Sequence, residues 1–141
     1  TPVGLTLDAQ GNVFVSEYFN NVIRKITPAG QVSTFAGQPG KGGFADGKAA
    51  QALFLHPQTL SFAPDGSLIV ADTGNNRVRR IAPDGTVSTL AGNGEGEKVA
   101  PGALPGTLHQ PYGVQALADG SVLVTGMNAI LRIQLATPLK T

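Results

Sequence analysis

The side chains with the most evident chemistry in this chain are two histidines, each placed just before a proline. His56 directly precedes Pro57, and His109 stands two residues before Pro111. Imidazole is a common metal ligand, but a zinc site needs three or four convergent ligands. The chain provides these two histidines, one register apart, and no cysteine that could add a thiolate or a disulfide. We therefore expect loop histidines that pack or face solvent, with no metal and no cofactor, and keep a metal site as the alternative.

A second polar group fills segment 72–77, which has the sequence Asp-Thr-Gly-Asn-Asn-Arg. Glycine and asparagine tolerate a left-handed backbone, and aspartate bonds to nearby main chain, so the segment predicts a tight chain reversal. Asp72, Asn75 and Asn76 could bind a polar ligand. The simpler interpretation is structural, because the Asp72 carboxylate can accept N–H groups of the turn and pair with a nearby arginine.

The sequence on either side of segment 72–77 favours β-strands, so strands are expected to position its polar side chains. Residues 68–71, Leu-Ile-Val-Ala, form an apolar run without alternation, which predicts a strand that is covered on both faces. Asp-Gly pairs at 65–66, 84–85 and 119–120 predict hairpins. The strands expected around the turn are 59–63, 68–72, 77–82 and 87–91. They form one antiparallel, four-stranded unit.

This unit occurs about three times in the chain. Each copy opens with a proline, at spacings of 55 and 54 residues, at Pro2, Pro57 and Pro111. Segments 32–37 and 87–92 are also repeated, as Val-Ser-Thr-Phe-Ala-Gly and Val-Ser-Thr-Leu-Ala-Gly. A period of about 50 residues is typical of solenoids, propellers or arrays, and four antiparallel strands make one propeller blade. The predicted fold class is therefore all-β, a β-propeller.

The repeat resembles the NHL repeat, whose blades carry a proline-opened strand and later a Thr-Gly-Asn-Asn-Arg turn. Residues 57–92 match nearly position for position, and residues 2–37 match with Glu-Tyr-Phe at 17–19 in place of Asp-Thr-Gly. The third copy, 111–135, departs from the pattern. Its segment from Val124 to Ile133 is two residues shorter than the corresponding segment of the second copy, from Val70 to Ile81. Its fourth strand, after Ile133, is expected to be absent or degenerate.

The resemblance implies an incomplete ring. NHL propellers usually close with about six blades, whereas this chain encodes two full blades and a partial third. We expect 1–141 to be one partial propeller domain. Open faces at both ends would expose apolar surface and sheet edges, so the remaining blades should come from the same longer chain or from a second copy.

Two long connectors, 38–56 and 93–110, join the blades. In the first, the apolar residues expected to pack between blades are Phe44, Ala49, Ala50, Ala52, Leu53 and Phe54. Asp46 is a candidate N-cap for a short helical turn over 48–53. The second connector is small and polar, as expected of a surface loop.

Topology predicts one end of the ring as the ligand-binding face. In an up-and-down blade, the turns between second and third strands emerge at the same end as the connectors. Polar groups that converge near the mouth of a channel form the default binding site. The residues collected there are Glu17, Tyr18, Asn20, Asn21, His56, Asp72, Asn75, Asn76, His109 and Tyr112.

We expect a non-catalytic binding or scaffold module of a larger NHL-repeat protein, which recognises a protein, peptide or glycan through this face. The resemblance leaves two alternatives. One is part of a metal-dependent six-bladed propeller enzyme, similar to a lyase or a lactonase. The other is a module for single-stranded RNA, which would use a basic face and stacking aromatic residues, for which Tyr18, Phe19 and Tyr112 are the nearby candidates.

Charge and composition favour neither a nucleic-acid partner nor a membrane span. The formal net charge is +1, and no apolar run is long enough to cross a bilayer as a helix. The basic residues of the third strands are expected on a solvated face: Arg24, Lys25, Arg77, Arg79, Arg80 and Arg132. The resemblance favours an extracytoplasmic location, periplasmic or secreted.

Overall fold

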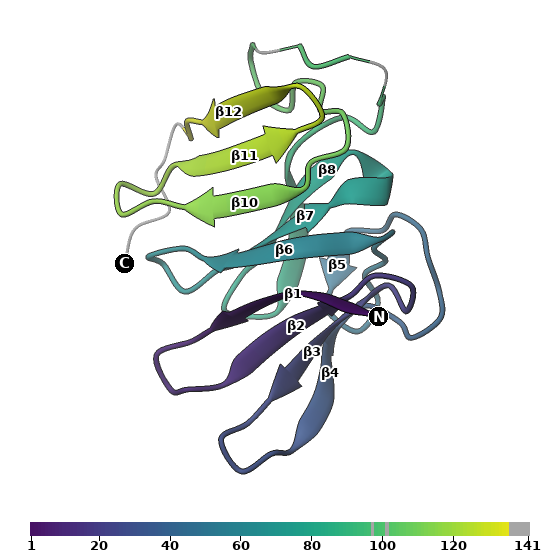
Figure 1. Cartoon of the computed structure of the whole chain (residues 1–141), viewed down its shortest axis with the longest axis vertical. Coiled ribbons are helices and arrows are strands. Elements are labelled where there is room, and N and C mark those ends of the chain that lie inside the picture. Colours follow the sequence, from purple (N-terminus) through teal and green to yellow (C-terminus); the bar gives the residue numbers. More distant parts are fainter. Residues whose placement is uncertain (97, 101, 136–141) are drawn as a thin grey trace.

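The chain folds into three antiparallel sheets, which are the blades of a propeller (Figure 1). The computed structural model describes residues 1–96, 98–100 and 102–135. Blade 1 consists of β1 (Pro2–Leu7), β2 (Val13–Glu17), β3 (Val22–Ile26) and β4 (Val32–Ala36). Blade 2 consists of β6 (Pro57–Phe62), β7 (Leu68–Asp72), η1 (Thr73–Asn75), β8 (Arg77–Ile81) and β9 (Thr86–Ala91). Blade 3 consists of β10 (Gly113–Ala116), β11 (Val122–Gly126) and β12 (Ala129–Ile133).

The strands of blade 2 agree closely with the sequence prediction. β7 has the predicted bounds, and all five of its residues are buried, as the unbroken apolar run indicated. β6 begins two residues earlier than expected, at Pro57, and β9 begins one residue earlier, at Thr86. The all-β fold with antiparallel blades is thus confirmed.

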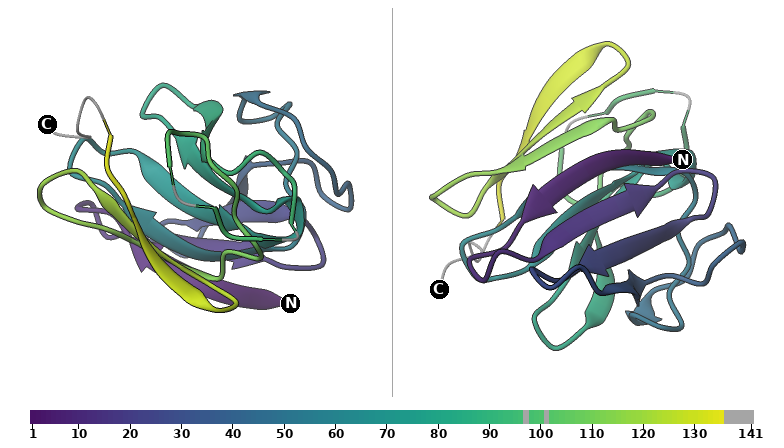
Figure 2. Two further views of the ribbon diagram at one scale, coloured as in Figure 1. Left: turned by 90° about the horizontal axis from the view of Figure 1, so that it is seen from above. Right: turned by 60° about the horizontal axis from the view of Figure 1, so that its bottom comes forward.

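The first strands of the blades, β1, β6 and β10, lie next to one another in chain order (Figure 1). Each later strand follows outward, so the last strands, such as β4, lie away from this edge (Figure 2). Side chains link the first strands directly. Thr59 Oγ1 donates to Tyr112 O at 2.7 Å and accepts from Val114 N at 2.8 Å, and Ser61 Oγ accepts from Ala116 N at 3.0 Å. These bonds fix the spacing of neighbouring blades at the inner edge.

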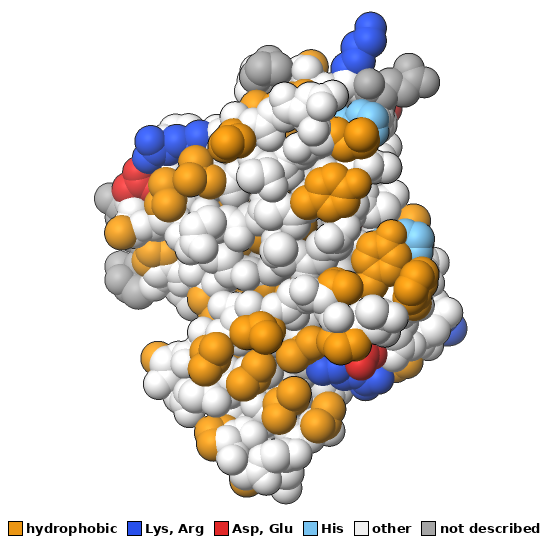
Figure 3. All heavy atoms as spheres, viewed as in Figure 1, with side chains coloured by type: hydrophobic (Ala, Val, Ile, Leu, Met, Phe, Trp, Pro, Cys, Tyr) orange, Lys and Arg blue, Asp and Glu red, His pale blue; other side chains and the backbone are white. Residues whose placement is uncertain are grey.

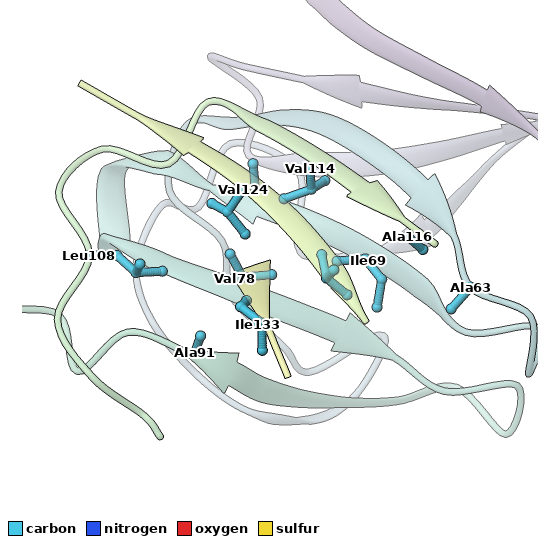
Figure 4. Close-up of a cluster of buried hydrophobic side chains, with 11 residues drawn as sticks. Ala63, Ile69, Val78, Ala91, Leu108, Val114, Ala116, Val124 and Ile133 are labelled. Atoms are coloured by element: carbon cyan, nitrogen blue, oxygen red, sulfur yellow. The ribbon is translucent and has the colours of Figure 1, made fainter. Parts of the chain in front are cut away.

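Apolar side chains fill the two spaces between blades. Between blades 1 and 2 the Phe14 ring lies edge-on to Phe35 and Phe62, with centroids 4.9 and 5.0 Å apart. Between blades 2 and 3 a second cluster includes Ile69, Val78 and Val124 (Figure 4). Burial of this apolar area is the main force that holds the blades together.

The first connector contains no regular helix, but the expected helical turn over 48–53 is present as one turn, because Gln51 N and Ala52 N both donate to Lys48 O, at 2.8 and 2.9 Å. Residues 47–48 form a short strand, β5 (Gly47–Lys48), which pairs antiparallel with β9 at the outer edge of blade 2. Asp46 caps no helix, because its carboxylate binds the Arg79 side chain instead, with Oδ1 2.6 Å from Arg79 Nη2. The expected packing of Ala52 and Phe54 between blades 1 and 2 is confirmed, and Ala49 packs against the same cluster. Phe44 is 45% exposed and Ala50 is also exposed, so for these two the expectation is wrong.

Blade 3 is shorter because β11 and β12 join through a tight hairpin, in which Gly126 pairs with Ala129. β12 ends at Ile133, and the next two residues form no strand. The rest of the expected degenerate fourth strand, 136–141, lies outside the described residues.

The turns at the opposite end from the connectors share an aspartate that accepts a backbone N–H. Asp65, Asp84 and Asp119 each accept from the residue two positions later, at 2.9 Å. Partial burial acts to raise the pKa of Asp65, but hydrogen bonds from Ser67 and Arg80 outweigh it and lower that pKa below 3.8. The Ser121 side chain and backbone, with Arg132, also lower the pKa of Asp119. The folded chain therefore stabilises the ionised form of these carboxylates more than the unfolded chain does.

This depression of aspartate pKa values predicts acid sensitivity. Above the ordinary pKa of 3.8 the stabilisation is fully present, because both states are ionised. As the pH falls below this value, the unfolded state takes up protons first, so the free energy of unfolding decreases. Urea denaturation across this pH range measures the effect, and Asp65→Asn should make the dependence shallower. A free energy of unfolding that stays level into the acid range would contradict the prediction.

Candidate functional site

The predicted ligand-binding end is organised by two asparagines with left-handed backbone. Asn21 and Asn76, with φ of 58° and 52°, end the turns that follow β2 and β7. Asn21 Oδ1 accepts from His56 N at 2.9 Å, and Asn76 Oδ1 accepts from Gln110 N at 2.8 Å. Each asparagine thus holds the end of the connector that leads into the next blade. The turns and the connector ends do converge, as the topology predicted.

An aromatic cluster of Tyr18, Phe19 and His56 lies at this end. The Tyr18 and His56 rings are stacked, with centroids 4.4 Å apart and an angle of 4° between planes. Phe19 stands edge-on to Tyr18 at 4.9 Å and to His56 at 6.2 Å, and it is 69% exposed. Figure 3 shows orange side chains beside the pale blue histidines along one border of the molecule. The aromatic cluster therefore presents an apolar surface of rings that are packed against one another.

Asp72 ends β7, where it pairs with Pro57, and it is fully buried. Its Oδ1 accepts from Leu55 N at 2.8 Å, and its Oδ2 accepts from Asn75 Nδ2 at 2.8 Å and from Arg79 Nη1 at 2.7 Å. Burial raises the pKa of the Asp72 carboxyl, and these three hydrogen bonds act in the opposite direction. The contacts agree with the structural interpretation of Asp72, since its partners come from the turn, the connector and an arginine.

Arg79 corrects the expectation that all third-strand basic residues are solvated. Its side chain is fully buried and lies between Asp72 and Asp46, with the Phe44 and Phe54 ring centroids 4.8 and 5.1 Å from its Cζ. A guanidinium tolerates burial here because its donors are paired with carboxylates and carbonyls and its planar faces lie against rings. Arg79 therefore ties the first connector to blade 2.

Glu17 and Asn20 are also occupied by internal contacts. Asn20 Nδ2 donates to Glu17 Oε2 at 2.7 Å, and Arg24 Nε lies 3.3 Å from the same oxygen. The Asn20 hydrogen bond, followed by the charge of Arg24, lowers the pKa of Glu17 against the effect of partial burial. Glu17 is thus ionised at neutral pH and positions the turn that carries the aromatic cluster.

His109 and Tyr112 belong to a different part of the same end. His109 lies beside the β11–β12 hairpin, where its carbonyl accepts from Met127 N at 3.4 Å, and it borders a cavity of about 320 Å³. Tyr112 is 39% exposed, and its hydroxyl donates to Gln110 Oε1 at 2.8 Å. The two histidines therefore have separate surroundings: His56 contacts Tyr18, and His109 contacts blade 3. Within the part of the chain that the structure describes, no group of three or more His, Asp or Glu side chains could hold a metal ion.

The predicted residues therefore divide into two kinds. Tyr18, His56, His109 and Tyr112 present side-chain surface, whereas Glu17, Asn20, Asp72, Asn75 and Asn76 bind other parts of the chain. Phe19, the most exposed ring of the cluster, was missing from the predicted face. Its signal in the sequence is the departure from the repeat at 17–19, where Glu-Tyr-Phe replaces Asp-Thr-Gly.

The three antiparallel blades have four, five and three strands, with β5 counted in blade 2. They are joined at their first strands and carry loops at one end, which defines a segment of a β-propeller. A crystal structure of a Bacteroides thetaiotaomicron protein of unknown function has the same fold, with a TM-score of 0.80 and 26% sequence identity. The match covers 86% of this chain and 32% of that protein.

The family model of the NHL repeat matches residues 54–81. The chain therefore contains an NHL repeat at residues 54–81, within the sheets of a β-propeller fold. SUPPRESSOR OF QUENCHING 1, a chloroplastic protein of Arabidopsis thaliana, is 37% identical over 81 residues, which cover 57% of this chain and 8% of that protein. Teneurin-1 of Caenorhabditis elegans is 34% identical over 125 residues, 84% of this chain and 4% of the teneurin. The chain thus spans a small part of the length of these curated relatives.

Among the described residues, no helix has the length and apolar character needed to cross a bilayer.

Proposed function

We propose that this chain is part of a non-catalytic binding module, which recognises a protein, peptide or glycan through the loop end of an NHL-repeat propeller. The observation that carries the proposal is the stack of Tyr18 on His56 with the exposed Phe19 beside it. Rings that are held in place lose little conformational freedom on binding, so they suit the apolar face of a sugar or a hydrophobic peptide side chain.

Hydrogen bonds around the aromatic cluster hold its loops in place, which supports a binding role. Asn21 fixes the backbone of His56, and Glu17 holds Asn20 within the same turn. A site built on such turns is preorganised, because its loops are already bonded to the rigid blades. The Tyr112 hydroxyl and the His109 ring add hydrogen-bonding groups elsewhere on the same end.

Truncation of the aromatic cluster is expected to weaken ligand binding. A glycan array and a displayed peptide library, both probed with the chain, would provide a ligand, and Tyr18→Ala and Phe19→Ala should each lower its affinity about tenfold or more. Val32→Ala is the matched control, because it shortens an exposed hydrophobic side chain at the far end of blade 1. Ligands whose affinity is the same for all three variants and the unchanged chain would refute the proposal, as would the absence of any ligand.

A further inference from the structure

The second connector opens with an asparagine that is followed by a glycine, Asn93 and Gly94. Asparagine is a thermolabile residue, because the backbone nitrogen of the next residue can attack the carbon of the side-chain amide. A glycine in that next position leaves this nitrogen the least hindered. Among the seven asparagines of the chain, Asn93 is the one that precedes a glycine, so its surroundings decide whether this chemistry is favoured here.

The amide of Asn93 is exposed, and two hydrogen bonds fix its orientation. Its Oδ1 accepts from Glu95 N at 2.9 Å, and its Nδ2 donates to Glu95 Oε2 at 3.1 Å. The first bond bears on reactivity, because a backbone N–H stabilises the negative charge that develops on a carbonyl oxygen when a nucleophile adds to its carbon. The Glu95 N–H is therefore placed to assist attack on Asn93 Cγ, and the exposure of the amide admits water.

Gly94 provides the nucleophilic nitrogen, next to a cation. The hydrogen bonds among the described residues do not use the Gly94 N–H, so no such bond has to break before the nitrogen reacts. The guanidinium of Arg77 lies beside Gly94, since a Cβ added there would be 2.5 Å from Arg77 Nη1. Arg77 Nη2 also donates to Asn93 O at 2.8 Å. A positive charge this close to both residues stabilises the anion that forms when the Gly94 amide loses its proton.

We propose that Asn93 is a site of spontaneous deamidation, in which Arg77 and the Glu95 N–H stabilise the developing charge. Gly94 N forms a bond to Asn93 Cγ, and the bond between Cγ and Nδ2 breaks. The proton of the Gly94 amide leaves with Nδ2 as ammonia, so the product is a cyclic succinimide. Water then opens the ring at one of its two carbonyls, which gives aspartate or isoaspartate at position 93. Water is the co-reactant, and no atom changes its oxidation state.

The reaction changes the charge of the loop end at blade 2. The new carboxylate lies beside the Arg77 guanidinium, and the Glu95 carboxylate loses the amide that now donates to it. In the isoaspartyl form the main chain also gains a methylene group between residues 93 and 94. The segment that follows is closely packed, since a Cβ added at Gly96 would be 2.4 Å from Asn76 Nδ2. Deamidation therefore alters both the charge and the seating of the second connector.

The test is incubation of the folded chain at neutral pH and body temperature over several weeks. Mass spectrometry of its proteolytic peptides measures the conversion of amide to carboxyl at each asparagine. We expect position 93 to convert about tenfold faster than any other asparagine, because each of the others precedes a residue that carries a Cβ. Ion-exchange chromatography gives a second readout, since the reaction lowers the formal net charge of +1 by one. A conversion at position 93 no faster than at the other asparagines would overturn the proposal.

Three variants separate the contributions of the residues involved. Gly94→Ala should slow the conversion of Asn93 about tenfold, because the added Cβ hinders the attacking nitrogen. Arg77→Gln should slow it severalfold, since it removes the neighbouring cation. Arg132→Gln is the matched control: it removes an arginine of the third strand of blade 3, whose partner is Asp119, and should leave the rate unchanged. Circular dichroism shows that each variant is folded. A rate that Gly94→Ala or Arg77→Gln leaves unchanged would overturn the proposal.

Discussion

Replacement of Asp72 by alanine is expected to lower the free energy of unfolding by about 3–5 kcal/mol, the usual effect of removing one partner of a buried ion pair. The side chains of Asp72 and Arg79 are both fully buried. The substitution also removes the acceptor of Leu55 N–H and of the Asn75 amide. Asp46 remains beside Arg79, but its side chain is 40% exposed, so it compensates the buried charge only in part. Urea denaturation followed by circular dichroism measures the loss.

Two comparisons show whether this effect comes from the buried charge. Asp65→Ala removes a partly exposed pair with Arg80 and should lower the free energy of unfolding by about 1 kcal/mol or less. In blade 3, Leu131 occupies the position of Arg79 and packs against apolar residues. The double variant Asp72→Ala with Arg79→Leu should therefore lose less stability than Asp72→Ala alone. An Asp72→Ala variant as stable as Asp65→Ala would show that the network contributes little.

Gly92→Ala is expected to destabilise the chain on the order of 3 kcal/mol, through backbone strain and steric overlap together. Gly92 has a φ of +89°, and an added Cβ would lie 2.2 Å from the carbonyl oxygen of Asn76 and 3.0 Å from Cα of Arg77. These are backbone atoms, so they cannot move aside without moving the turn that holds Gln110. Thermal unfolding should show a clearly lower melting temperature.

The control for this prediction is Gly85→Ala. Gly85 has a similar φ of +83°, but nothing lies within 4 Å of its added Cβ, so it isolates the strain of the left-handed backbone. This variant should lose about 1 kcal/mol. Gly37, at the equivalent position of blade 1, would place its Cβ 2.7 Å from the carbonyl oxygen of Asn21 and should behave like Gly92. If Gly92→Ala and Gly85→Ala had equal effects, the overlap with Asn76 would be irrelevant.

Much of the fold could be predicted from the sequence, because it depends on local patterns that the repeat presents more than once. The Asp-Gly pairs mark hairpins, and the apolar run 68–71 marks a central strand. The alignment of copies then identifies the departures of the third blade. Periodicity also predicted that turns and connectors share one end, which placed Tyr18 and His56 together before their contact was known.

The errors concern contacts between residues far apart in the chain. Arg79 looks like a solvated strand residue, since its burial depends on Asp46 and two phenylalanines of the connector. Asp46 resembled a helix cap because its true partners, Arg79 and Thr89, are far away in the sequence. The stack of Tyr18 on His56 joins residues 38 positions apart, and His56 is held there with a left-handed backbone, φ of 52°, by a hydrogen bond to Asn21. No local pattern encodes these partnerships.

The asparagine at the end of the second-to-third turn in blades 1 and 2 has a consequence for how such proteins diversify. Asn21 and Asn76 fix the residue at which a connector enters the next blade, regardless of the path the connector takes before it. The entry point into the next blade is therefore fixed separately from the packing of the connector itself, which in the first connector involves Ala52, Phe54 and Asp46. Evolution, or an engineer, can insert or exchange sequence at exposed connector positions, away from such packed residues, and obtain a new displayed loop on the same scaffold.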